Sequence, residues 1–165
     1  MIAVALSEVA VVPALATLME EMDRFYWAVE FEPPLQRAAQ IREALFGTRP
    51  AGYTLLAKDG DKVVGLAAYS FLWPAAGLTR SLFLKELYVG RRHQRQGVGR
   101  RLMQALCVTA VSSGCSRVEW QTEDDNMQAM EFYRSLGEPV HRGKVFYRLH
   151  GEGIRRLADE FVPRR

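Results

Sequence analysis

Cysteine and histidine are scarce in this sequence, which has two cysteines and three histidines among its 165 residues. Cys107 and Cys115 are too few for a disulfide framework, and we expect both to be packing residues. His93, His141 and His150 lack the close spacing of the ligands in a zinc site. We therefore expect no metal ion.

The N-terminus lacks the features of a membrane anchor or a signal peptide. Its first stretch, MIAVALSEVAVVPALATL, is apolar. It meets Glu8 and Pro13 too early to span a bilayer, and no basic residues precede it. We therefore expect a cytoplasmic protein that does not contact a membrane.

Neither sign of charge dominates, because 22 basic and 19 acidic residues give a formal net charge of +3. No helix-turn-helix, zinc-finger or RNA-binding pattern accompanies this small basic excess, so nucleic acid is not an expected partner. A chain of 165 residues that is 48% hydrophobic is long enough for one substantial core. We expect a single domain spanning residues 1–165.

The most informative stretch is residues 81–106, SLFLKELYVGRRHQRQGVGRRLMQAL. It predicts a strand at residues 82–89, then a basic loop and an amphipathic helix that begins near Gly97. The first turn of a helix offers unpaired N–H groups to an anion, and Gly97 and Gly99 have no Cβ to hold the anion away. The pattern predicts a phosphate or pyrophosphate site, with five arginines nearby: Arg91, Arg92, Arg95, Arg100 and Arg101.

Two common phosphate-binding patterns fit this loop poorly. A Walker A loop requires Gly-Lys-Ser/Thr, whereas this loop ends in Gly-Arg-Arg. A dinucleotide fingerprint requires a third glycine or an alanine where this chain has Leu102. The fingerprint must also follow its strand directly, whereas residues 90–96 separate Gly97 from the predicted strand in this chain. Glu119 lies at a suitable distance downstream, so the dinucleotide alternative stays open.

A third pattern fits better. Gln94-Arg95-Gln96-Gly97-Val98-Gly99 resembles the Gln/Arg-x-x-Gly-x-Gly/Ala pyrophosphate loop of the GCN5-related N-acetyltransferase (GNAT) family. A later stretch resembles the family's Asn-x-x-Ala-x-x-Phe-Tyr-x-x-x-Gly motif, with Asn126, Ala129, Phe132, Tyr133 and Gly137. The resemblance covers residues 53–149 and looks closest to the branch of polyamine (spermidine/spermine) acetyltransferases.

The resemblance implies an α/β fold, the acyl-CoA N-acyltransferase fold. This fold has a mixed, mostly antiparallel sheet, a central parallel strand–helix–strand crossover and flanking helices. The two strands that flank the crossover part at their ends, where the amide-containing arm of acetyl-CoA can complete the sheet. The resemblance assigns acetyl-CoA to these residues: Leu87, Tyr88, Val89, Gln94, Arg95, Gln96, Gly97, Val98, Gly99, Arg100, Asn126, Ala129 and Tyr133.

The resemblance also implies direct transfer of the acetyl group to a primary amine. It assigns Tyr133 as the acid that protonates the departing thiolate, since a phenol is protonated at neutral pH. It assigns Glu86 as the base, although Glu86 and Lys85 can instead form a structural ion pair. Polyamine acetyltransferases usually carry two adjacent acids where this chain has Lys85-Glu86. Trp73 is expected either to contact the acceptor, together with Glu86, or to plug the edge of the core.

Periodicity predicts the remaining elements. Strands are predicted at residues 2–6, 53–58, 62–70, 117–121 and 144–149, and helices at residues 13–29, 35–46, 126–136 and 151–161. Alternation places Leu82, Leu84, Glu86 and Tyr88 on one face of their strand. Acidic residues of the first two helices either attract a cationic amine or form a solvated face.

We predict an acetyl-CoA-dependent N-acetyltransferase for a small amine such as a polyamine. A homodimer is expected by analogy with the family. Three alternatives stay open: a non-catalytic module that binds coenzyme A, a protein N-acetyltransferase, and a nucleic-acid binder that uses the arginine loop.

Overall fold

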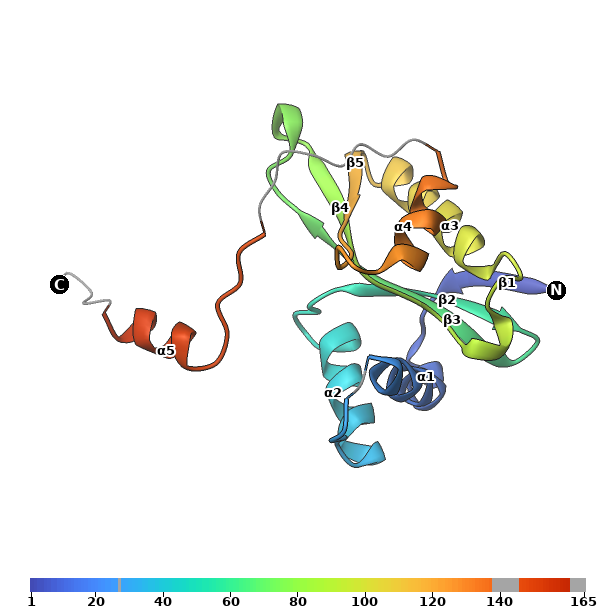
Figure 1. The fold of residues 1–165 in the computed structure, drawn as a ribbon, viewed down its shortest axis with the longest axis horizontal. Helices are drawn as coiled ribbons and strands as arrows, with labels where there is room; N and C mark the ends of the chain where they lie inside the picture. The colour runs from blue at the N-terminus through green and yellow to red at the C-terminus, as the bar shows by residue number, and fades with distance from the viewer. Residues whose placement is uncertain (27, 138–145, 161–165) are drawn as a thin grey trace. The chain divides into compact units, whose positions relative to one another are not determined.

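The computed structural model describes residues 1–26, 28–137 and 146–160 (Figure 1). The chain forms two compact units, Met1–Met127 and Gln128–Arg165, which we describe separately.

The first unit is built on a five-stranded mixed sheet in the order β1–β2–β3–β4–β5. Neighbouring strands are antiparallel from β1 to β4, whereas β4 and β5 are parallel. A parallel pair needs a crossover connection, which α3 (Val98–Ser112) supplies. The strands are β1 (Ile2–Leu6), β2 (Tyr53–Asp59), β3 (Lys62–Leu72), β4 (Arg80–Val89) and β5 (Cys115–Trp120). The mixed α/β fold is therefore confirmed.

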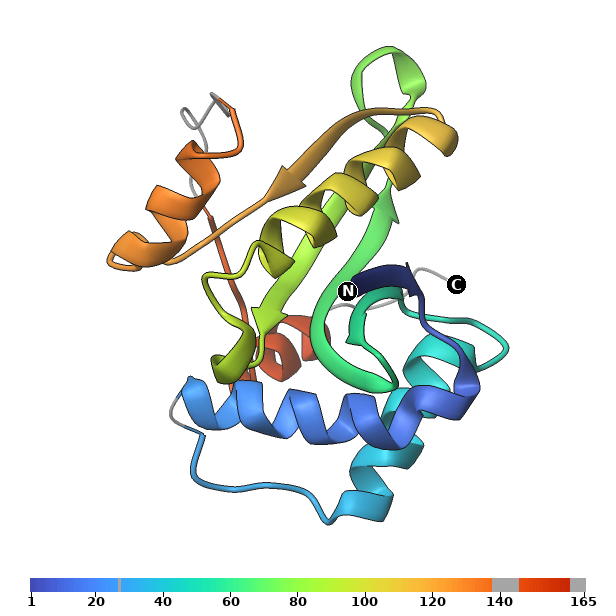
Figure 2. The same ribbon diagram turned by 90° about the vertical axis from the view of Figure 1, so that its right-hand side faces the viewer.

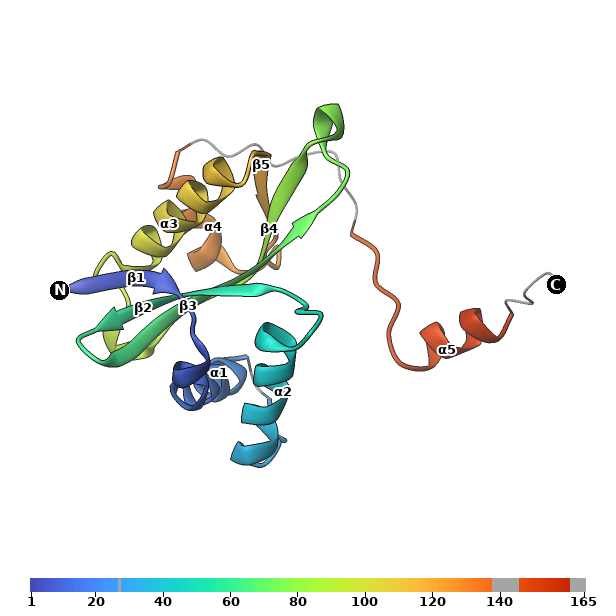
Figure 3. The same ribbon diagram turned by 180° about the vertical axis from the view of Figure 1, so that it is seen from behind.

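Helices cover both faces of this sheet (Figure 3). On one face, α1 (Val12–Phe25) and α2 (Pro34–Phe46) pack on Leu56, Leu66 and Tyr88 through buried residues that include Leu15 and Ile41. On the other face, α3 buries Val98, Leu102, Met103, Leu106 and Ala110 at the helical spacing that the sequence predicted.

Truncating the centre of the α3 face will destabilise this unit. Leu102 is 0% exposed, so we expect Leu102→Ala to lower the free energy of unfolding by about 3 kcal/mol through lost burial and the cavity left behind. Val108 lies on the same helix and is 69% exposed, so Val108→Ala should change that free energy by less than about 0.5 kcal/mol. Urea unfolding measures both values, and equal effects would contradict this packing.

The bounds of the first helix were predicted wrongly. α1 ends at Phe25, and Val29, which continues the apolar period, is 89% exposed. Aromatic and β-branched residues are weak helix formers, so Tyr26 and Val29 give the backbone little reason to stay helical. The predicted strands at residues 2–6, 53–58, 62–70 and 117–121 and the helix at 35–46 are confirmed, within a few residues at their ends.

A β-bulge at Lys85 corrects the predicted faces of β4. Tyr69 pairs with Leu84 and Ala68 pairs with Glu86, which leaves Lys85 as the extra residue. Paired residues share a face, so Leu84 and Glu86 lie on opposite faces rather than on one. Glu86 and Tyr88 share the face that α1 and α2 cover. Simple alternation could not reveal the added residue.

A second bulge lies beside Gly65 in β3. Ala57 pairs with Gly65 and Lys58 with Val63, so Val64 is the extra residue. A Cβ on Gly65 would lie 3.1 Å from the Tyr88 carbonyl oxygen and 3.2 Å from Leu102 Cδ1. Glycine therefore lets β3, β4 and α3 approach closely.

The second unit contains α5 (Glu152–Asp159) and most of α4 (Met127–Arg134), which ends two residues before the predicted end. Both helices were predicted. The strand predicted at residues 144–149 is wrong where it can be compared, because residues 146–149 form no strand; residues 144–145 lie outside the described residues. Phe146, Tyr147 and Leu149 are 61%, 86% and 59% exposed. Alternating apolar residues favour a strand only where another strand pairs with them.

Candidate functional site

The sheet opens between β4 and β5 (Figure 2). Their pairing begins at Arg80 and Cys115 and ends at Leu84 and Trp120, whereas β4 continues to Val89 along β3. The Gly90 N–H donates to the Val64 carbonyl of β3 over 2.9 Å. Because successive residues of a strand point their backbone groups to opposite sides, Leu87 and Val89 direct theirs away from β3, toward the opening.

The N-terminus of α3 follows this part of β4 after the loop of residues 90–97. Gly97 caps the helix with φ +78°, in the left-handed region that favours glycine. Within the described part of the chain, apart from Gly97 and its two neighbours in sequence, no atom lies within 4 Å of the position that a Cβ on Gly97 would take. The first-turn N–H groups have no partner further back in the helix, so this open tip is suited to an anion.

Two glutamine side chains brace the loop that leads to this tip. Gln94 Nε2 donates to the Val89 carbonyl over 3.0 Å, and Gln96 Nε2 donates to the Arg92 carbonyl over 2.9 Å. Arg95 lies between them, exposed, with φ +61°. Positive φ is uncommon outside glycine and often marks a functional loop. The glutamine side chains therefore shape the loop, and this role was not apparent from the motif.

Glu86 lies beyond the Lys85 bulge, in the part of β4 that β5 does not pair with. Its side chain is 35% exposed, and its Oε1 lies 3.4 Å from Lys85 Nζ, whose side chain is 60% exposed. The ion pair considered from the sequence is therefore present. Pairs this exposed contribute little stability, and the carboxylate stays accessible to solvent.

The end of α1 lies close to Glu86. Burial, and then the charge of Glu86, raise the pKa of Tyr26 above its usual 10.0. The Phe25 ring lies 5.3 Å from the Tyr26 ring and 6.0 Å from the Tyr88 ring, measured between centroids. Tyr26 is a candidate site residue that the sequence did not predict. The only signal was the aromatic run that follows the amphipathic helix.

Glu21 connects α1 to the start of the arginine loop. Its Oε1 accepts the Tyr88 hydroxyl and the Arg91 N–H, each over 3.0 Å. Burial, followed by the interaction with Glu21, raises the pKa of Tyr88 to about 12. Tyr88 therefore stays protonated at neutral pH, and its hydroxyl proton is directed to Glu21.

The structure does not bring Trp73 next to Glu86. Leu72 pairs with Ser81 and Ala68 pairs with Glu86, four positions apart on β3, which corresponds to about 13 Å along a strand. Trp73 is 67% exposed and its indole N–H donates to the Leu78 carbonyl over 3.1 Å. The expectation that it plugs the core edge is wrong, and its contact with the acceptor stays a prediction.

The residues of the later motif lie on and just before α4. The Asn126 N–H donates to the Glu123 carbonyl over 3.2 Å in the turn that precedes the helix. Ala129 and Tyr133 belong to the second unit, where the Tyr133 ring lies 5.3 Å from the Phe132 ring. Both rings therefore extend from one turn of α4.

In the portion that the structure describes, no three His, Cys, Asp or Glu side chains gather as metal ligands would. None of the helices described there has the length and apolar character needed to cross a membrane.

Known proteins resemble this chain in sequence and in fold. The thialysine N-epsilon-acetyltransferase of Mus musculus is 28% identical over 144 residues, which cover 78% of this chain and 84% of that protein. The L-ornithine N5-acetyltransferase of Arabidopsis thaliana is 26% identical over 95 residues, covering 58% and 42%. A solved integron cassette protein from V. cholerae superposes with a TM-score of 0.89 at 27% identity, covering 96% of this chain and 98% of that one.

A family model described as "Acetyltransferase (GNAT) family" matches residues 16–137. This match includes the parting strands, the glycine tip of α3 and the later motif on α4. The chain therefore belongs to the acetyltransferase (GNAT) family, as its two motifs predicted.

Proposed function

We propose that this acetyltransferase transfers the acetyl group of acetyl-CoA directly to a primary amine of a small molecule. One observation carries the proposal: the opening between β4 and β5 lies beside the open, glycine-capped tip of α3. A ligand that combines a diphosphate with an amide-containing arm can supply hydrogen-bond partners to the N–H groups of the tip and to the strand backbone at the opening.

The residues of the first unit fit acetyl-CoA. The diphosphate would lie on the N–H groups of the α3 tip, with arginine charge nearby. The pantetheine amides would pair with the backbone of Leu87 and Val89, in the manner of an added strand. The proposed contacts are Leu87, Tyr88, Val89, Gln94, Arg95, Gln96, Gly97, Val98, Gly99 and Arg100, completed by Asn126, Ala129 and Tyr133.

Acetyl-CoA supplies an acetyl group that is activated as a thioester. Glu86 accepts a proton from the ammonium form of the substrate, directly or through water, so that the nitrogen lone pair can bond to the carbonyl carbon. The bonded nitrogen then releases its second proton to water. The Val89 N–H stabilises the negative charge that develops on the carbonyl oxygen. Tyr133 donates its proton to the sulfur as the carbon–sulfur bond breaks. The products are an N-acetyl amine and free coenzyme A.

The two relatives named for thialysine and L-ornithine support a small amine as the acceptor. The family match crosses the boundary between the two units, which supports one acetyltransferase domain over residues 1–165. We further propose a cytoplasmic homodimer that binds neither nucleic acid nor membranes and needs no metal ion.

Thiol release from acetyl-CoA tests the proposed reaction. The protein is incubated with acetyl-CoA and a panel of lysine analogues, ornithine, polyamines, aminoglycosides and peptides, and mass spectrometry identifies the product. We expect thiol release together with a mono-acetylated small amine. Binding of acetyl-CoA without thiol release on any acceptor would instead identify a non-catalytic module, and acetylated peptide alone would contradict the small acceptor.

Removing the carboxylate of Glu86 will slow the transfer. We expect Glu86→Gln to lower kcat/KM for the amine by about 100-fold, the usual contribution of a general base. Acetyl-CoA affinity should stay within about twofold, because the substitution leaves the backbone of β4 unchanged. Glu43→Gln, at an exposed position of α2, is the matched control. Equal rates for the two variants would remove Glu86 from the mechanism.

A further inference from the structure

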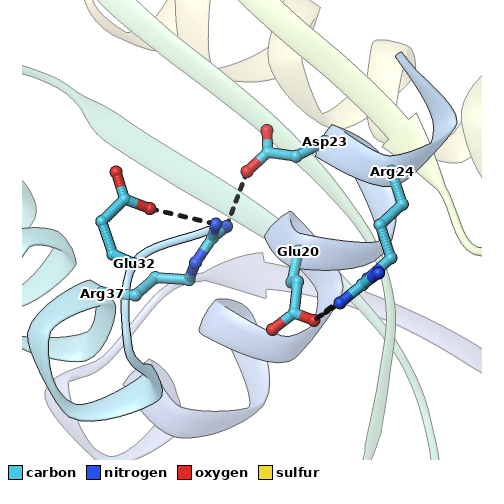
Figure 4. Close-up of polar contacts among 5 residues, drawn as sticks. All are labelled: Glu20, Asp23, Arg24, Glu32 and Arg37. Atoms are coloured by element: carbon cyan, nitrogen blue, oxygen red, sulfur yellow. Dashed lines mark hydrogen bonds and ion pairs between the residues drawn. The ribbon is translucent and has the colours of Figure 1, made fainter. Parts of the chain in front are cut away.

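One buried arginine joins α1 to the start of α2 (Figure 4). The side chain of Arg37 is 8% exposed, although it belongs to α2 and carries a full charge. Its Nη1 lies 2.6 Å from Asp23 Oδ2 of α1, and its Nη2 lies 3.2 Å from Glu32 Oε2, just before α2. A single guanidinium therefore holds one carboxylate at the end of α1 and one near the end of the α1–α2 connection.

The geometry of this contact is specific to arginine. A planar guanidinium directs separate N–H groups to separate partners, which an ammonium group cannot do with the same geometry. The buried Nε of Arg37 has no hydrogen-bond partner among the described residues. A buried charge with incomplete pairing is costly and is weak evidence for added stability. The burial of Arg37 is therefore better explained by the groups that it positions than by a gain in stability.

A second arginine supports the same connection. Arg24 pairs with Glu20 over 2.7 Å, and its Cζ lies 4.1 Å from the centre of the Phe31 ring. The Arg37 Cζ lies 5.8 Å from that ring centre. Both guanidinium groups therefore contact the Phe31 ring, which anchors the connection between α1 and α2.

The acidic residues of this region are mostly paired within the protein. Glu20 is bound to Arg24, Asp23 and Glu32 are bound to Arg37, and Glu21 accepts two hydrogen bonds. The two helices therefore use most of this acidity for internal contacts rather than offering it freely to a cationic amine.

The position of Asp23 links this cluster to the proposed site. Asp23 lies in the last turn of α1, and the N–H groups of Tyr26 and Ala28 both donate to its carbonyl oxygen, over 3.1 and 3.0 Å. The Tyr26 ring lies 5.3 Å from the Phe25 ring, which lies 6.0 Å from the Tyr88 ring, and Tyr88 shares its face of β4 with Glu86. A contact that fixes Asp23 therefore also fixes the short stretch that sets Tyr26 beside Glu86.

We propose that Arg37 is a positioning residue for the acceptor amine, because its grip on Asp23 and Glu32 holds the end of α1, and with it Tyr26, beside Glu86. The inference rests on the proposed function, in which Glu86 receives the proton of the amine. It predicts that replacing Arg37 raises the KM for the amine and leaves the affinity for acetyl-CoA unchanged, since the proposed diphosphate site lies on α3.

Steady-state kinetics and calorimetry test the role with Arg37→Met, which keeps a long side chain but removes the charge. We expect the KM for the amine identified by thiol release to rise about tenfold, a loss of about 1.4 kcal/mol, while the Kd for acetyl-CoA stays within about twofold. Arg37→Lys should recover part of the loss. The control is Arg42→Met, at an exposed position of the same helix, which should keep both constants.

The titration of Tyr26 gives a readout that does not depend on turnover. NMR of labelled tyrosines, with the Tyr26 signal assigned through Tyr26→Phe, should show the raised pKa of Tyr26 in the wild type. That pKa should return toward 10 in Arg37→Met, as Tyr26 leaves its buried position near Glu86. An unchanged pKa together with an unchanged amine KM would overturn the proposal.

A purely structural role gives different results. If Arg37→Met lowers the melting temperature and weakens the binding of the amine and of acetyl-CoA alike, Arg37 only stabilises the fold and the proposal is wrong. Should that variant not fold, the triple variant Asp23→Asn, Glu32→Gln, Arg37→Met leaves no unpaired charge, and the same KM and Kd comparison decides. A wild type without thiol release on any amine would refute the proposed function, and the Tyr26 titration would then still decide whether Arg37 fixes Tyr26.

Discussion

Replacing Gly99 with glutamate should abolish the binding of acetyl-CoA. Gly99 lies in the first turn of α3, where the proposed site holds the diphosphate. A carboxylate there adds bulk and places like charges side by side, which costs several kcal/mol. We expect the Kd to rise more than about 100-fold, corresponding to at least about 2.7 kcal/mol, and isothermal titration calorimetry measures it.

The matched control adds the same charge to the same helix, away from its tip. Val108 is 69% exposed on α3, so Val108→Glu should fold normally and keep the wild-type affinity for acetyl-CoA. If Gly99→Glu binds as tightly as this control, the diphosphate does not lie on the α3 tip.

Removing the phenol hydroxyl of Tyr133 should slow turnover without weakening the binding of acetyl-CoA. We expect Tyr133→Phe to lower kcat by about 100-fold, because the thiolate would then leave without its proton donor. Phenylalanine keeps the ring and its packing beside Phe132, so the Kd for acetyl-CoA should stay within about twofold. Stopped-flow measurement of thiol release and calorimetry of acetyl-CoA separate these two effects.

An acceptor amine with a low pKa sharpens this test, because its attack needs no base and leaves protonation of the sulfur as the demanding step. Tyr147, which is 86% exposed in the same unit, gives the control Tyr147→Phe, for which we expect the wild-type rate. A wild-type rate for Tyr133→Phe as well would exclude Tyr133 as the acid.

Local patterns predicted most of the first unit. Glycine at the start of an amphipathic helix and the alternation in β2 and β3 each depend on a few neighbouring residues, so their physical meaning does not depend on distant contacts. The faces of β4 were different. The extra residue at Lys85 changes the direction of each following side chain, and only the register against β3 reveals it.

The candidate site divides in the same way. The glycine tip and the motif residues were found because their chemistry is encoded in a short stretch. Tyr26, Glu21 and Arg37 were missed because their roles come from contacts across the fold, such as the hydrogen bond from the Tyr88 hydroxyl to Glu21. Arg37 in particular reads as an ordinary charged residue of an amphipathic helix, and only its burial between two carboxylates distinguishes it.

A crystal structure of the protein with coenzyme A tests the central claim most directly. We predict that the diphosphate oxygens accept hydrogen bonds from the N–H groups at the α3 tip, and that the pantetheine amides pair with Leu87 and Val89 in the opening between β4 and β5. Coenzyme A bound elsewhere, with side chains covering Gly97 or β5 paired along the whole of β4, would contradict the account.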